Sequence, residues 1–321
     1  VATAGDYCYV SLGNSGIRIV NTTNPAHSQE LGYCDTPGSA LELAVADSFV
    51  YVADGSFGLR IINVADPTNP HEVGFYDTPG IANCVAISGN FAYVADGSSG
   101  LHAINVSNPS NPQFVGTYFV QGAFARDVAI SGNYAYVIYG GLSIIDVANP
   151  AQMVLISIPN TMSNPSNVEV SGNYAYVTGQ SGVFTLIGYL QVIDVTNPAN
   201  PQIRGDYREA GSGQGGLRSR GSAIFCFTVS DNYAYISSYY GWSDEQFPHP
   251  TFHSEYYQRI LDVANPDSFG YIRVVNMVRM ILPETITPIS PFPIVSITPH
   301  AASRVCYIVV CRTCRSLLDG V

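Results

Sequence analysis

The sequence predicts an all-β fold, a seven-bladed β-propeller of four-stranded antiparallel repeats. Three observations lead to this prediction: a motif that recurs about every 42 residues, strand-like segments between tight turns, and a composition poor in helix formers. The chain has 321 residues, of which 30 are glycine, 20 proline and 22 tyrosine, while 46% are hydrophobic. So many apolar residues exclude a disordered chain, and so much glycine and proline excludes a helical bundle.

The repeat is clearest around a tyrosine that is followed by valine or isoleucine. Residues 43–64, 85–106 and 128–147 are variants of one unit. The tyrosine recurs at Tyr9, Tyr51, Tyr93, Tyr136, Tyr176 and Tyr235, and its first four spacings are 42, 42, 43 and 40 residues. A degenerate seventh copy places Tyr307 in the same role. This constant period favours stacked blades over a string of small β domains.

Each repeat contains four segments that read as strands. The first is short and apolar, as in Val-Ala-Ile-Ser, and a two-residue turn such as Gly132-Asn133 leads into the second, aromatic segment. The second and third segments are apolar at successive positions, which indicates strands covered on both faces. Asn-Pro connections lead to the fourth segment, as at residues 71–77, since proline belongs outside the ladder.

We expect a single domain over residues 1–321. Residues 1–269 hold blades one to six, and residues 270–321 hold a divergent, proline-rich bridge and blade seven. The apolar run Ile272–Leu282 fits the fourth strand of blade six. The last blade lacks its own fourth strand. Either the sequence is truncated there, or the blade has an open edge that can pair with another chain.

The repeat pattern Gly-Asn-Tyr-Ala-Tyr-Val, followed by Gly-Leu, Ile-Ile-Asp-Val and paired Asn-Pro steps, resembles the LVIVD-repeat family. The resemblance covers roughly residues 1–269. It implies a β-propeller, an extracellular or cell-surface location in bacteria or archaea, and no established biochemical activity. The motif specifies a blade and no chemistry.

Three insertions are predicted to form long loops at one end of the propeller. They span residues 178–190, 207–222 and 239–259. Loops on a rigid scaffold commonly carry binding residues, and aromatic rings beside charges suit a glycan or a protein. The candidate binding residues are Arg218, Arg220, Tyr239, Tyr240, Trp242, Asp244, His249, His253 and Tyr256. The alternative is a self-packed loop whose aromatic residues cover the end of the propeller.

No catalytic or metal motif stands out, so we predict no enzyme, no cofactor and no metal. His249 and His253 have ligand-like spacing, but Pro248 and Pro250 disfavour the helix that would align them. Most of the seven cysteines read as small core residues, and a Cys8–Cys34 bridge is not expected because their strands are not neighbours.

Short polar residues end the third strand of each repeat and are expected to cap the Asn-Pro turn. These residues are Asn21, Asn63, Asn105, Asp146, Asp194 and Asp262. Asn21 and Asn105 also lie in glycosylation sequons. Asp54 and Asp96 read as turn residues between the second and third strands.

The charge of the chain excludes nucleic acid as a partner. All 13 basic residues are arginine and 24 residues are acidic, so the net charge is −11. Such a chain lacks the basic surface that binds nucleic acid. No apolar run is long enough for a transmembrane helix. Our leading hypothesis is a non-enzymatic surface or extracellular protein that acts by structural contact, including self-association through the open edge. The alternatives are a glycan- or protein-recognition module that uses loops 207–222 and 239–259, and a hydrolase or lyase at the same end.

Overall fold

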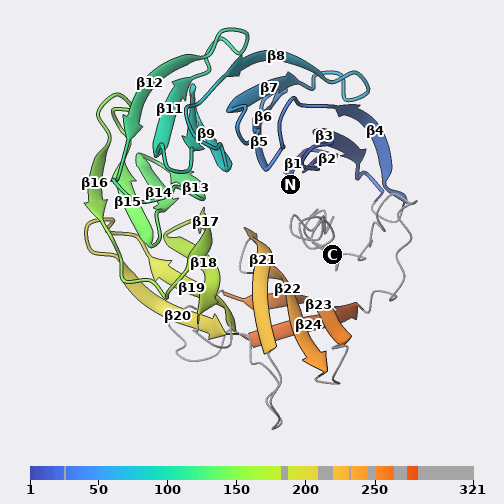
Figure 1. The fold of residues 1–321 in the computed structure, drawn as a ribbon, viewed down its shortest axis with the longest axis vertical. Helices are drawn as coiled ribbons and strands as arrows, with labels where there is room; N and C mark the ends of the chain where they lie inside the picture. Colours follow the sequence, from blue (N-terminus) through green and yellow to red (C-terminus); the bar gives the residue numbers. More distant parts are fainter. Residues whose placement is uncertain are drawn as a thin grey trace. The chain divides into compact units, whose positions relative to one another are not determined.

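The fold consists of six four-stranded antiparallel sheets in a computed structural model (Figure 1). The model describes residues 1–24, 27–181, 187–208, 220–230, 233–244, 251–263 and 273–280. The described residues contain no α-helix. Among them there is no helix long and apolar enough to cross a membrane.

The strands follow the chain order within every sheet, so the first strand lies at one edge and the fourth at the other. Sheet one holds β1 (Ala2–Ala4), β2 (Tyr7–Ser11), β3 (Ile17–Asn21) and β4 (Gln29–Cys34). Sheet two holds β5 (Glu42–Ala46), β6 (Phe49–Ala53), β7 (Leu59–Asn63) and β8 (His71–Tyr76). Sheet three holds β9 (Cys84–Ser88), β10 (Phe91–Ala95), β11 (Leu101–Asn105) and β12 (Gln113–Tyr118).

The later sheets repeat this order with longer strands towards the C-terminus. Sheet four holds β13 (Val128–Ser131), β14 (Tyr134–Ile138), β15 (Leu142–Asp146) and β16 (Val154–Ser157). Sheet five holds β17 (Pro165–Ser171), β18 (Tyr174–Ser181), β19 (Ile187–Asp194) and β20 (Gln202–Arg208). Sheet six holds β21 (Arg220–Ser230), β22 (Tyr233–Asp244), β23 (Thr251–Asp262) and β24 (Arg273–Met280).

The described residues fall into two compact units. Unit 1 comprises Val1–Tyr139 and Asp146–Val154, and unit 2 comprises Gly140–Ile145 and the described residues from Leu155 onward. Within unit 1 the first strands of successive sheets are neighbours, because β1 contacts β5, β5 contacts β9, and β9 contacts β13. Sheets that stack through their first strands are the blades of a β-propeller.

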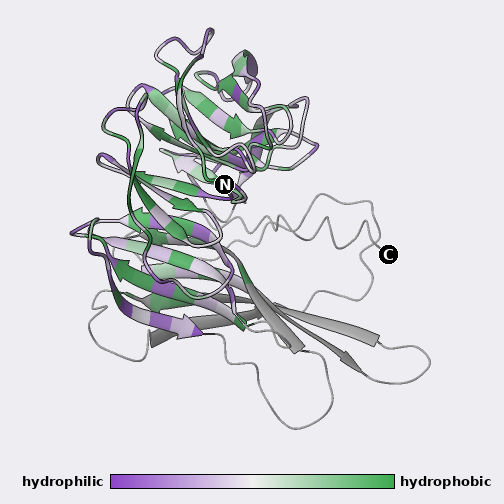
Figure 2. Ribbon diagram, turned by 60° about the vertical axis from the view of Figure 1, so that its left-hand side comes forward, coloured by the Kyte–Doolittle hydropathy of each residue, from purple (hydrophilic) through white to green (hydrophobic). Residues whose placement is uncertain are grey.

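The core of unit 1 lies between successive sheets, as the apolar second and third strands predicted. One cluster joins Tyr51 and Ile61 of sheet two to Val85 and Val94 of sheet three. Burying such residues contributes about 1.5–3 kcal/mol for each large side chain. Figure 2 shows hydrophobic residues concentrated on the strands and hydrophilic residues on many of the connecting turns.

The turns between first and second strands have the predicted positive φ at their first residue. Gly89 and Gly132 have φ values of 53° and 56°, and Asp47 adopts 53° without being glycine. Aspartate is one of the few residues that tolerates this region. The prediction of a φ-positive turn is therefore confirmed at that position.

The prediction of seven blades is confirmed only in part. The described residues form six sheets, and β24 confirms the expected fourth strand of blade six. Residues 281–321, on which the seventh blade and its open edge would be built, lie outside the described residues.

The predicted long loops are partly strands. Tyr239–Asp244 continue β22, and residues 251–259 belong to β23, so these segments form an extended hairpin. The same holds for β18 and β19, which lengthen across residues 178–181 and 187–190. For β22 and β23 the physical reason is that runs of tyrosine, tryptophan and phenylalanine favour extended backbone.

Candidate functional site

The predicted binding residues of the last sheet are ordered by strand register. Arg220 stands opposite Trp242 between β21 and β22, and Trp242 stands opposite His253 between β22 and β23. Tyr240 pairs with Glu255, Tyr239 pairs with Tyr256, and Asp244 pairs with Thr251. Arg218 and His249 lie outside the described residues. The register thus brings several predicted residues into adjacent positions of one sheet, while their role in binding stays a prediction.

A second candidate surface lies in unit 1, where the structure describes the side chains. The turns between second and third strands and the connections into the next sheet meet at one end of the blades. Gly55 and Ala82 exchange backbone hydrogen bonds of 3.2 and 2.9 Å, and Gly97 and Ala125 exchange bonds of 3.1 and 2.8 Å. We call this region, residues 54–58, 77–83, 96–100 and 119–127, the loop end.

Buried aspartates hold the loop end together. Asp54 is fully buried, and its carboxylate accepts hydrogen bonds from Thr36 Oγ1 (2.6 Å) and from the Gly38 amide (2.8 Å). Asp96 accepts the equivalent bonds from Thr78 and Gly80. Both carboxylates therefore hold backbone in place, and the reading of them as turn residues is confirmed.

The pKa of the Asp54 carboxyl is raised, with burial as its largest cause. The hydrogen bonds from Thr36 and Gly38 oppose this shift, as does the charge of Arg60. A carboxylate that accepts several hydrogen bonds in a buried place stabilises one local conformation. The hydrogen bonds from Thr36 and Gly38 to Asp54 therefore fix the backbone around the turn that contains Asp54.

Arg60 is the buried basic residue beneath the loop end. Its side chain is 7% exposed, it forms an ion pair of 2.7 Å with Asp77, and it lies 3.8 Å from Glu72. Its guanidinium carbon is 4.5 Å from the ring centre of Phe75 and 5.6 Å from that of Phe57. Contacts of this kind orient the aromatic rings and restrict their rotation.

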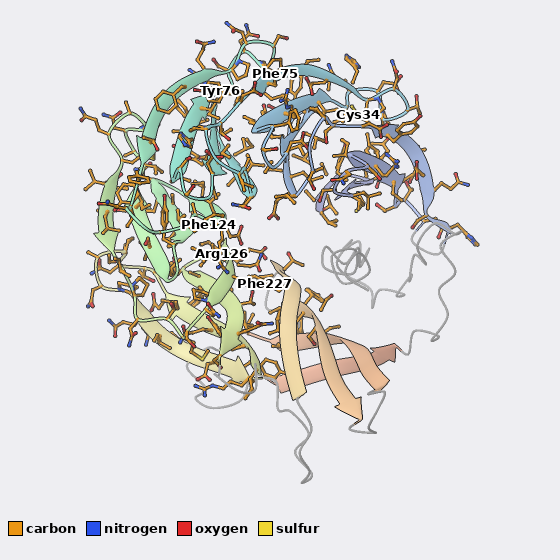
Figure 3. The ribbon with its side chains drawn as sticks, in the orientation of Figure 1. Cys34, Phe75, Tyr76, Phe124, Arg126 and Phe227 are labelled. Atoms are coloured by element: carbon orange, nitrogen blue, oxygen red, sulfur yellow. The ribbon has the colours of Figure 1, made fainter. Side chains whose placement is uncertain are left out.

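Four large apolar side chains are exposed at the loop end. Phe57 is 42% exposed, Ile81 47%, Phe119 55% and Phe124 41%. Ile81 and Phe124 occupy the same repeat position, each directly before an alanine that bridges two sheets. Figure 3 shows Phe124 and Arg126 on the segment that leads into β13, and Phe75 and Tyr76 on the outer strand β8.

Two of these rings pack against glycine backbone. A Cβ on Gly38 would lie 2.8 Å from Phe57, and one on Gly97 would lie 3.0 Å from Phe124. Glycine at these positions therefore lets each ring rest on the backbone with its other face in solvent. An aromatic ring that is already fixed loses little conformational entropy when a partner covers it.

A cluster of three potential metal ligands also lies in unit 1. Glu42, Cys84 and Asp127 place one ligand atom each within 4.8 Å of the others. From the sequence, we predict that most cysteines are core residues and we predict no metal site. The missed signal is the period, because these residues are 42 and 43 positions apart and directly begin or precede the first strands β5, β9 and β13.

The structure describes the side chains of three cysteines. Cys8 and Cys84 are buried and Cys34 is partly buried, and none of the three forms a disulfide. This confirms that Cys8 and Cys34 are not bridged. Burial is the largest cause that raises the pKa of the Cys34 thiol.

The fold is that of the β-propeller proteins. A structure titled as the β-propeller domain of Cps50 (Swd1) from Myceliophteria thermophila matches with a TM-score of 0.60 at 10% identity, over 85% of this chain and 83% of that chain. The computationally designed Ika8 protein matches with a TM-score of 0.56 at 10% identity, over 86% of this chain and 72% of that chain. No curated protein matches the chain.

Within this class, the chain belongs to the LVIVD repeat family. The family model matches residues 1–36, 37–78, 79–120, 122–161 and 163–209. These five matches correspond to the first five sheets, and they confirm the resemblance drawn from the repeat motif.

Proposed function

We propose that the protein is a non-enzymatic interaction protein whose loop end binds a protein partner. The observation that carries this proposal is the group of exposed apolar side chains Phe57, Ile81, Phe119 and Phe124 at one end of adjacent blades. Scattered exposed apolar residues are normal, but a group on a rigid scaffold is typical of a protein-binding surface.

The outer strands supply the competing surface. Tyr33 on β4 is 58% exposed and Val154 on β16 is 57% exposed. Arg18 lies 4.7 Å from the Tyr33 ring centre, however, and Arg60 lies closer to Phe75 than to Phe57. Tyr33 and Phe75 are thus covered in part by arginines of their own sheets. We favour the loop end because its exposed apolar residues lie on adjacent blades, beside the backbone bridges that fix it.

An extracellular or cell-surface location is part of the same proposal and is supported by the family resemblance. Self-association through the edge of a seventh blade stays a prediction, because that edge falls on residues 281–321. The glycan- or protein-recognition alternative is favoured by one observation, the register that places Arg220, Trp242 and His253 side by side.

The test compares two folded variants as immobilised baits. The Ile81→Ser/Phe124→Ser double variant removes apolar side chains from the loop end, and Tyr33→Ser/Val154→Ser removes still more exposed ones from the outer strands. Proteins from the source cells and their medium are retained on each bait and quantified by mass spectrometry. We expect a partner that the outer-strand variant retains and the loop-end variant retains at least about tenfold less.

Circular dichroism and thermal melting first establish that both variants fold like the wild type, as surface substitutions should. Equal retention of every protein by the two variants would overturn the proposal. Retention of no protein by the wild type would also overturn it.

A further inference from the structure

The feature that carries a further inference is the cluster of Glu42, Cys84 and Asp127. Each residue stands at the start of the first strand of its sheet, where Glu42 pairs with Ala53 and Cys84 pairs with Ala95. The Asp127 carbonyl accepts a bond of 3.0 Å from the Ile138 amide, which puts Asp127 in the same relation to β14. Because β5, β9 and β13 are neighbours in unit 1, the repeat period itself brings these side chains together.

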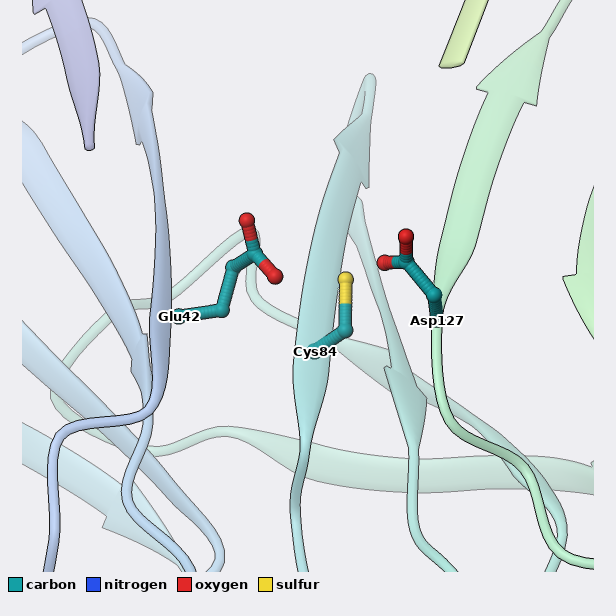
Figure 4. Close-up of side chains that lie close together, drawn as sticks. All are labelled: Glu42, Cys84 and Asp127. Carbon is teal, nitrogen blue, oxygen red and sulfur yellow. The ribbon is translucent and has the colours of Figure 1, made fainter. Parts of the chain in front are cut away.

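The geometry of the cluster suits a small cation. The three ligand atoms lie within 4.8 Å of one another, and Figure 4 shows the Cys84 sulfur between the two carboxylates, both of which are turned toward it. Bonds of about 2.0–2.3 Å in a tetrahedral zinc site place ligands about 3.3–3.8 Å apart. Side-chain movements of about 1 Å therefore bring the three ligand atoms to the spacing of a zinc site.

The cluster is set into the protein rather than on its surface. Cys84 is 4% exposed and Asp127 is 6% exposed, while Glu42 is partly exposed. Asp127 Oδ1 accepts a hydrogen bond of 3.0 Å from the Val128 amide, which fixes the direction of the carboxylate. Outer hydrogen bonds of this kind orient the ligands of metal sites.

The surroundings of Cys84 favour the protonated form of its thiol. Burial is the largest cause that raises the pKa of Cys84 well above its usual value, and the charges of Asp127 and Glu42 raise it further. The Cys84 thiol donates a hydrogen bond of 3.5 Å to the Val128 carbonyl oxygen. A divalent cation would displace this proton and bind the resulting thiolate together with the carboxylates.

We propose that Glu42, Cys84 and Asp127 bind one zinc ion, with water as the fourth ligand on the Glu42 side. The thiol selects zinc or cadmium over calcium and magnesium, which prefer ligand sets made of oxygen alone. The ion ties together the starts of three successive first strands, so its expected role is to stabilise unit 1. This proposal does not depend on the loop end as a partner surface.

The test uses cadmium and zinc with the full chain after chelator treatment. Cadmium bound to a thiolate gives a charge-transfer absorption in the near ultraviolet, and zinc is measured by its competition with cadmium. We expect Cys84→Ser to lose the absorption of one thiolate per chain relative to the wild type. Cys8→Ser, which removes another buried cysteine outside the cluster, is the matched control and should keep that absorption.

Asp127→Asn keeps the thiol and provides a second measurement if Cys84→Ser does not fold. We expect it to lower zinc affinity at least about tenfold. Zinc should also raise the melting temperature of the wild type and of Cys8→Ser, but not that of Asp127→Asn. Equal cadmium absorption in Cys84→Ser and the wild type would overturn the proposal, as would unchanged zinc affinity in a folded Asp127→Asn variant.

Discussion

Short polar side chains fix the turns that follow the third strands. Asn21, Asn63, Asn105, Asp146 and Asp194 each accept a hydrogen bond from the backbone amide two residues later, at 2.8–2.9 Å. The side-chain oxygen is sufficient to accept this hydrogen bond and no charge is needed, because Asn and Asp make the same bond in different repeats. The caps predicted from the sequence are confirmed at these five positions, and the side chain of Asp262 is not described.

Asp194 differs from the other caps because it also meets an arginine. Arg204 donates to Asp194 Oδ2 at 2.6 Å from Nη2 and 3.1 Å from Nε. Hydrogen bonds from Thr196, and next from Arg204, lower the pKa of Asp194 to about 2. A lowered pKa in the folded state means that the ionised carboxylate stabilises the fold.

We predict that Asp194→Asn destabilises the protein by about 0.5 kcal/mol at pH 7, since the ion pair is partly exposed. The stabilisation is present above the unfolded pKa of about 4, and it is lost as the pH falls through the folded value of about 2. Urea unfolding should therefore show a difference from the wild type that is constant from pH 7 to 5 and shrinks below pH 4.

Asp146→Asn is the matched control, because it alters the same cap in the preceding repeat. An asparagine cap should serve there as Asn63 and Asn105 do. A pH dependence of equal size in both variants would contradict the role assigned to Arg204.

The turn caps could be predicted from the sequence, whereas the cluster of Glu42, Cys84 and Asp127 could not. The caps were predictable because each depends on residues two positions apart. The cluster of Glu42, Cys84 and Asp127 depends on three different residue types in three repeats, so a motif search within one segment does not find it. Only the period, combined with the stacking of first strands, shows that these residues are neighbours.

The fourth strands share an irregularity that the sequence analysis did not predict. A register shift occurs in the pairing of β4, β8, β12 and β20 with their third strands, and a glycine lies beside each shift. These glycines are Gly32, Gly74, Gly116 and Gly205. A bulge of this kind bends an outer strand and increases its twist.

The bulge glycines of unit 1 make room for the next repeat. A Cβ on Gly74 would lie 2.1 Å from the Pro109 carbonyl oxygen, and one on Gly116 would lie 2.4 Å from that of Pro150. The Asn-Pro turn of one sheet therefore packs on the glycine of the preceding sheet. The glycines recur with the period of the repeat, so their spacing was the available signal.

We predict that Gly74→Ala lowers the free energy of unfolding by about 1–3 kcal/mol, because the added methyl group overpacks a contact with rigid backbone. Chemical denaturation measures this change. Gly141→Ala is the control, since its Cβ would meet only Thr161 Oγ1 at 3.9 Å. A loss of stability in Gly74→Ala no larger than in the control would show that the two sheets are not packed closely there.

At the scale of the whole molecule, the period was sufficient to predict the fold class. Strand order, strand boundaries near the repeat motif and the positions of the buried tyrosines all follow from it. The hairpin of β22 and β23 was read as a loop because its length interrupts the period. Strand register, which places Trp242 opposite Arg220, depends on pairing between distant residues and is not visible in one segment.

The surface that we propose for binding was also not predicted. Sequence reasoning favoured the aromatic segment 239–259, since it is rich in tyrosine and holds the only tryptophan. Phe57, Ile81, Phe119 and Phe124 are ordinary apolar residues in the sequence. Their exposure becomes visible only when the bridges Gly55–Ala82 and Gly97–Ala125 fix the loop end.

The loop end of unit 1 is the surface that we propose as the binding site of this propeller. Hydrogen exchange of the protein, measured with and without the partner retained by the bait experiment, tests it most directly. We predict that bound partner slows exchange in residues 54–58, 77–83, 96–100 and 119–127 and leaves β4, β8 and β12 unchanged. Slowed exchange in those outer strands, with the loop end unchanged, would contradict the claim.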